Sequence, residues 1–77
     1  MDEIRRQLQA PFRYVVVYKE VQCGDRVIPT QYVFEKRERG FRFGDVEFSE
    51  EEMAGIIRDA LSQGFRIYYT NQKEVKR

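Results

Sequence analysis

The residues best suited to chemistry in this sequence are four basic side chains gathered in the run "KRERGFRF". They are Lys36, Arg37, Arg39 and Arg42. Basic side chains bind phosphate and carboxylate oxygens through charge-assisted hydrogen bonds, and arginine does so in bidentate geometry. The first candidate site is therefore a basic hairpin that binds an anion, a nucleic acid or an acidic partner.

The register of that hairpin decides how strong the case for a site is. If Arg39 and Gly40 form the turn, Arg37 and Arg42 lie opposite each other on adjacent strands. Like charges placed cross-strand are destabilising, and a bound anion would relieve the repulsion. In the alternative interpretation, neighbouring glutamates neutralise the cluster, and its charges only keep a sheet edge from pairing.

A second candidate site is an aromatic surface on the sheet face that the main helix is not expected to cover. Its members are Tyr14, Val16, Tyr18, Arg66 and Tyr68. Tyrosine and arginine stack on unpaired bases, and they are also enriched in protein interfaces. We assign this surface to a protein partner or to a second copy that buries Val16 and Tyr18. Nucleic acid is one alternative, and cover by the N-terminal helix through Ile4 and Leu8 is another.

Catalytic and metal sites have little support in the sequence. It contains no histidine and one cysteine, Cys23, so the usual zinc and copper ligand sets are absent and no histidine can activate the thiol. Consecutive helical carboxylates at Glu50, Glu51 and Glu52 point in different directions, and we interpret them as helix N-terminal charge. We therefore predict a protein that is not an enzyme and has no metal or cofactor.

Length and composition set the class of protein. A chain of 77 residues with 42% hydrophobic and 35% charged residues is typical of one small folded domain. The net charge of +1 gives no general attraction to nucleic acid, so any such binding needs a local patch. No apolar run has the length of a signal peptide or a membrane span, which predicts a cytoplasmic protein without membrane contact.

The first half of the chain predicts a weak helix followed by a β-hairpin. Residues 1–10 form a short N-terminal helix or arm, stopped by Pro11. Residues 12–22 and 27–36 are rich in β-branched and aromatic side chains and return on each other through a Gly24-Asp25 turn. This register pairs Val21 with Ile28, Val17 with Tyr32 and Val15 with Phe34.

The second half predicts a strand, a strong helix and a final strand. Residues 41–48 form one strand, with a bulge at Gly44 and Asp45 that corrects the alternation of its apolar residues. Ser49 and Glu52 have the spacing of a capping box, which begins an amphipathic helix that ends at Gly64. Residues 65–70 form the last strand, and 71–77 a frayed tail.

The predicted fold is a single α+β domain, 1–77, with a three- to four-stranded, mainly antiparallel sheet and one helix packed on one face. The element order is α-β-β-β-α-β. The expected core consists of Phe34, Phe43, Val46, Phe48, Ile57, Leu61 and Ile67. The function that fits best is a small interaction domain, an adaptor, regulator or inhibitor of another protein that forms a homodimer. The alternative is a nucleic-acid-binding module that uses the basic hairpin and the sheet tyrosines.

Overall fold

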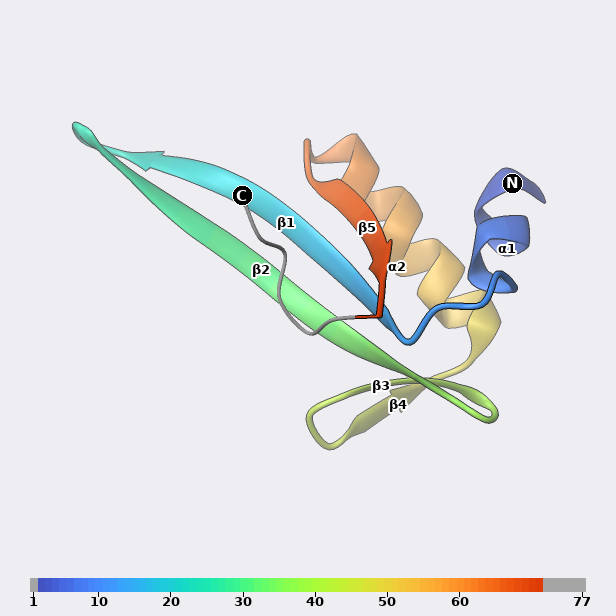
Figure 1. Ribbon diagram of the computed structural model, residues 1–77. Helices are drawn as coiled ribbons and strands as arrows, with labels where there is room; N and C mark the ends of the chain where they lie inside the picture. Colours follow the sequence, from blue (N-terminus) through green and yellow to red (C-terminus); the bar gives the residue numbers. More distant parts are fainter. Residues whose placement is uncertain (1, 72–77) are drawn as a thin grey trace.

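The computed structural model describes residues 2–71, which form a five-stranded antiparallel sheet with two helices on one face (Figure 1). The elements are α1 (Asp2–Leu8), β1 (Tyr14–Cys23), β2 (Arg26–Arg37), β3 (Gly40–Phe43), β4 (Val46–Phe48), α2 (Glu50–Ser62) and β5 (Arg66–Thr70). The strand order is β4-β3-β2-β1-β5. The α+β class is confirmed, although the described residues form five strands instead of three or four. The predicted frayed tail lies, from residue 72 on, outside the described residues.

The additional strand arises at Gly44 and Asp45, where the chain reverses instead of bulging. These two residues form the turn of a β3–β4 hairpin that pairs Phe41 with Phe48 and Phe43 with Val46. Gly44 has a φ of +60°, and a glycine at the first turn position is typical of type II′ hairpin turns. Phe41, Phe43, Val46 and Phe48 do share one face of the sheet, as predicted. They share it because they lie on two paired strands, and not because one strand contains a bulge.

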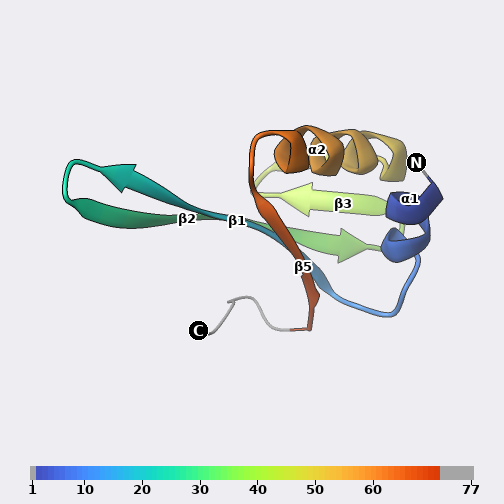
Figure 2. The same cartoon turned by 90° about the horizontal axis from the view of Figure 1, so that it is seen from above.

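The first hairpin has the predicted register. Val21 pairs with Ile28, Val17 with Tyr32 and Val15 with Phe34, around the Gly24-Asp25 turn. β5 pairs only with Tyr14–Tyr18 and β3 only with Glu35–Arg37, so the outer part of this hairpin has no further strand beside it in the described part of the chain. We call residues 20–29 the β-finger. It projects beyond the helices and makes the molecule 41 Å long against 24 and 23 Å across (Figures 1 and 2).

The core lies between the sheet and the helices. Its buried members are Leu8, Phe12, Val15, Val17, Phe34, Phe41, Met53, Ala54, Ile57 and Ala60. The capping box predicted for α2 is present, with Ser49 Oγ accepting from Glu52 N at 3.0 Å and Ser49 N donating to Glu52 Oε1 at 2.8 Å. Of the predicted core, Phe34 and Ile57 are buried, and Phe48 and Ile67 pack against the core while partly exposed.

Three predicted core residues lie at the surface instead. Phe43, Val46 and Leu61 are 38%, 52% and 50% exposed. Leu61 lies on the same side of α2 as Ala54, two turns earlier, which is buried, so Leu61 is exposed because the cover of that side ends before it and not because it lies on another face. Phe43 and Val46 lie on the helix side of the sheet, at a place that α2 does not cover.

The N-terminal helix packs on the same side of the sheet as α2. Leu8 is 1% exposed and belongs to the core, and Ile4 packs against that core. The alternative in which these two residues cover the tyrosine surface is therefore wrong. No helix within residues 2–71 is long and apolar enough to cross a membrane.

Candidate functional site

The basic hairpin has a different register from the one predicted. Its turn is Glu38-Arg39, so Arg37 pairs with Gly40 and Arg42 pairs with Glu35. Arg37 and Arg42 are not cross-strand partners, and the predicted repulsion between them is wrong. The shift by one residue places Gly40, with a φ of +93°, where a Cβ would overlap the carbonyl oxygen of Phe48. Only glycine fits this position, because a side chain there would meet the backbone of β4.

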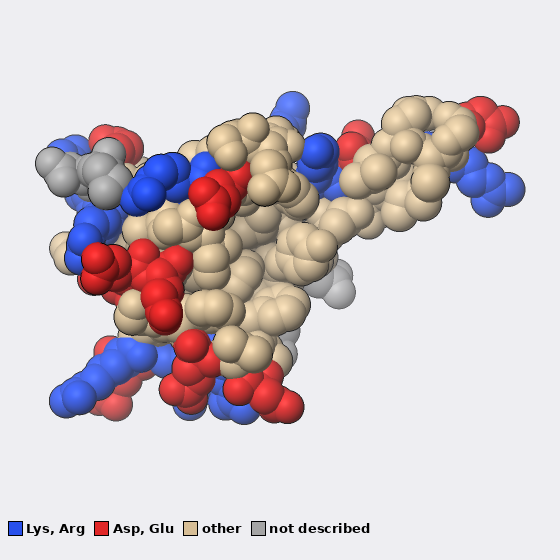
Figure 3. All heavy atoms as spheres, turned by 180° about the vertical axis from the view of Figure 1, so that it is seen from behind, with Lys and Arg blue, Asp and Glu red and all other residues tan. Residues whose placement is uncertain are grey.

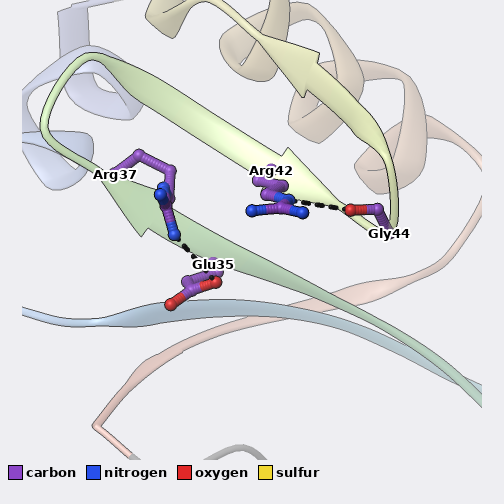
Figure 4. A network of polar contacts seen from close by, with 4 residues as sticks. All are labelled: Glu35, Arg37, Arg42 and Gly44. Atoms are coloured by element: carbon purple, nitrogen blue, oxygen red, sulfur yellow. Dashed lines mark hydrogen bonds and ion pairs between the residues drawn. The ribbon is translucent and has the colours of Figure 1, made fainter.

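The arginines of this hairpin have partners within the chain (Figure 4). Arg37 Nη1 lies 3.6 Å from Glu35 Oε1, with both side chains nearly half exposed. Arg42 Nε donates to the carbonyl oxygen of Gly44 at 2.9 Å, and on its other side Arg42 pairs with Glu47 of β4. Charges of both signs therefore alternate across this end of the sheet.

Lys36 points away from the arginines. Its Nζ donates to the carbonyl oxygen of Ala10 at 2.8 Å and lies 4.4 Å from the centre of the Phe12 ring. Both contacts are on the helix side of the sheet, since Lys36 pairs with the buried Phe41. Lys36 thus ties the α1–β1 connection to the sheet. Arg39 is exposed at the turn, and the four basic groups do not converge on one site.

The tyrosine surface is assembled as the alternation predicted. Val16 pairs with Tyr68, and Tyr18 with Arg66, so these residues share the face opposite the helices with Tyr14. The Tyr18 and Tyr68 rings meet edge to face at 6.4 Å, and Tyr18 Oη donates to Glu20 Oε2 at 3.0 Å. The tyrosines are half-buried and Arg66 is exposed. Val16 is fully buried within one chain, so it has no surface left to bury in a dimer.

A surface that sequence reasoning missed lies on the helix side of the sheet, beyond the end of α2. We call it the apolar strip. It consists of Val21, Ile28, Tyr32, Phe43 and Val46, which are 39%, 47%, 44%, 38% and 52% exposed. The strip begins as a cross-strand pair on the β-finger and ends at the β3–β4 turn. Figure 3 shows uncharged side chains continuing from the middle of this face onto the β-finger.

A groove lies beside the strip, between α2 and the sheet. It has a volume of about 250 Å³, with Ile56, Asp59 and Ala60 on the helix side and Tyr32, Phe34 and Phe65 opposite. The Tyr32 ring lies 6.2 Å from that of Phe65 and 6.1 Å from that of Phe43, which joins the groove to the strip. Asp59 is the charged residue in its lining.

Element lengths explain why this surface exists. A helix of 13 residues spans about 20 Å, whereas a strand of 12 residues spans about 40 Å. The helix therefore covers about half of β2, although apolar residues continue along the same face. A comparison of the predicted lengths of the helix and the strand would have indicated that part of the strand has no helix over it. The alternation of apolar residues by itself did not indicate this.

Other chemistry has less structural basis in the described residues. Residues 2–71 contain no group of three or more His, Cys, Asp or Glu placed to hold a metal ion. Cys23 is an exposed free thiol at the end of β1. Burial raises the pKa of Tyr69. The Tyr69 ring packs 5.2 Å from that of the core residue Phe12, so Tyr69 lies on the core side of the sheet and is not part of the tyrosine surface. Comparison with known proteins adds no family, since no protein-family model, curated protein or solved structure matches the chain.

Proposed function

We propose that this protein is a non-enzymatic interaction domain whose apolar strip binds a protein partner, either a different protein or a second copy of this chain. Bound to a different protein, it would act as an adaptor, regulator or inhibitor. The observation that supports the proposal is the β-finger, which carries the exposed Val21–Ile28 pair away from the core. A partner that covers this pair would remove apolar surface from water and stabilise the complex.

The β-finger is costly for an isolated chain, which is why a partner is expected. A two-stranded ribbon is marginally stable in water. Val21 and Ile28 do not belong to the core. A strand pair that projects with exposed aliphatic side chains fits recognition of a protein surface better than it fits binding of a small polar ligand.

The alternative of nucleic-acid binding has weaker support. Lys36 is engaged on the helix side, and Arg37 and Arg42 lie among Glu35 and Glu47 on the opposite side. A phosphate backbone would meet both signs of charge there, which reduces the counterion release that drives such binding. The tyrosine surface stays a second protein-binding candidate, with Tyr14, Tyr18 and Tyr68 half-buried.

The test is affinity capture with matched variants, using nuclease-treated extract of the source cells. Ile28→Lys places a charge in the strip, and Val27→Lys makes the same change on the opposite face of the β-finger, at a residue that is 53% exposed. We expect the parent and Val27→Lys to retain the same protein partner and Ile28→Lys to lose it. Retention of the partner by Ile28→Lys would refute the strip as the binding surface. Binding of nucleic acid alone by the parent, read as the 260 to 280 nm absorbance ratio after purification at low salt, would favour the alternative.

A further inference from the structure

The chain has two apolar surfaces, a projecting pair of side chains and a groove, that cannot contact each other within one copy. The Val21–Ile28 pair projects on the β-finger, and the groove between α2 and the sheet opens on the same side. The β-finger points away from the body of the molecule, so it cannot fold into its own groove (Figures 1 and 2). We infer that the partner of the apolar strip is a second copy of this chain, whose β-finger occupies the groove. This inference rests on the proposed function.

Spacing along β2 is consistent with a two-fold arrangement. Consider two β-fingers packed through their helix-side faces and running antiparallel about an axis beside the Lys19–Thr30 pair. Ile28 and Tyr32 lie two residues on either side of Thr30, about 7 Å each way. The axis therefore places Ile28 of each copy opposite Tyr32 of the other. Such an interface uses the same surface twice and closes at two copies.

Charge supports the same pairing. Arg26 has the same alternation as Ile28 and is exposed on the helix side of the β-finger. In the two-fold arrangement it falls opposite Phe34 of the second copy, in a groove whose wall includes Asp59. Opposite charges at the edge of an apolar contact favour one register over others.

The middle of this interface is free of a charge conflict. Lys19 lies at the axis in both copies, where two ammonium groups would repel each other. Its Nζ is instead turned toward the end of α2, where it donates to the carbonyl oxygen of Gln63 at 2.8 Å and lies 5.2 Å from the centre of the Phe65 ring. Of the Lys19–Thr30 pair, the side chain that remains at the two-fold axis is therefore the uncharged one of Thr30.

The experiment is a concentration series of the purified protein by sedimentation velocity, up to about 100 µM, where a dimer with a Kd of about 10 µM is mostly formed. We expect a dimer for the parent and for Val27→Lys. Ile28→Lys should raise the Kd at least about tenfold. Circular dichroism melting confirms that each variant is folded. Arg26→Asp and Asp59→Arg should each weaken the dimer, and their combination should restore it.

Two outcomes would overturn the inference. One is a monomeric parent over the whole series, and the other is a dimer that neither Ile28→Lys nor the charge changes weaken, which would place the contact on another face such as the tyrosine surface. The proposed function fails separately. If the parent is monomeric but captures a different protein in an Ile28-dependent way, only the second-copy assignment is lost, whereas a monomer without such a partner refutes both.

Discussion

At the scale of single residues, α2 shows that two residues one turn apart on the same side of a helix can differ in burial. Ile57 is fully buried and Leu61, one turn later, is half exposed. We expect Ile57→Ala to lower the free energy of unfolding by about 2 to 5 kcal/mol and Leu61→Ala by less than about 1 kcal/mol. Urea denaturation followed by circular dichroism measures both. Equal losses would mean that the side chain of Leu61 is buried as that of Ile57 is.

Lys36 carries a second prediction at this scale, because its two contacts are structural. Lys36→Met removes the hydrogen bond to the carbonyl of Ala10 and the cation–π contact with Phe12. We expect a loss of about 1 to 2 kcal/mol in the free energy of unfolding.

The matched control for Lys36 is Arg39→Met, at the exposed turn of the same hairpin. A surface change of this kind stays within about 0.5 kcal/mol. If the two variants unfold at the same urea concentration, Lys36 does not hold the α1–β1 connection and is available as an anion contact.

At the scale of elements, the start of α2 depends on the capping box. Ser49→Ala leaves the backbone N–H of Glu52 without its side-chain acceptor and should cost about 1 kcal/mol of stability. Ser62→Ala is the control, since Ser62 lies exposed in the last turn and its Oγ donates to the carbonyl of Asp59. That variant should unfold like the parent. The shift in the urea midpoint at constant m value tests both, and a larger effect at Ser62 would contradict the assignment.

The two hairpins show what turn residues determine and what they leave open. Gly24-Asp25 gave the register of β1 and β2 because the apolar alternation on both sides agreed with one turn position. The second hairpin offered two turn positions one residue apart, and its flanking residues are mostly charged. In the observed register Gly40 follows the Glu38-Arg39 turn and lies against the carbonyl of Phe48, where no side chain would fit.

At the scale of the whole molecule, the β-finger should be separable from the fold. Replacing residues 20–29 by Asn-Gly between Lys19 and Thr30 keeps a two-residue hairpin and removes no core residue. Lys19 and Thr30 form a hydrogen-bonded pair by alternation from the Lys36 N to Arg13 O bond, as such a turn requires. We expect a melting temperature within a few degrees of the parent and a monomer at all concentrations. A shortened chain that does not fold would show that the β-finger stabilises the sheet, and a shortened chain that still dimerises would contradict the interface.

The sequence by itself determined both helices, the first hairpin and the last strand, but not the division of residues 41–48 into two strands. The run of β-branched and aromatic residues from Tyr14 to Tyr18, apolar on both faces, and the cap at Ser49 are local signals that need no knowledge of distant residues. The same alternation placed Tyr14, Tyr18 and Tyr68 on one face, as the structure has them. Whether these tyrosines bind a partner stays a prediction.

Tertiary structure alone decided where the sheet is covered and where it is exposed. Val21, Phe43 and Val46 have the pattern of core residues, yet α2 ends before it reaches them and α1 packs beside α2 instead of on the opposite face. A side chain is buried only if another element reaches it, and reach depends on the lengths and docking of both elements. Apolar alternation reports which face of a strand is apolar, and it does not report how much of that face has a partner.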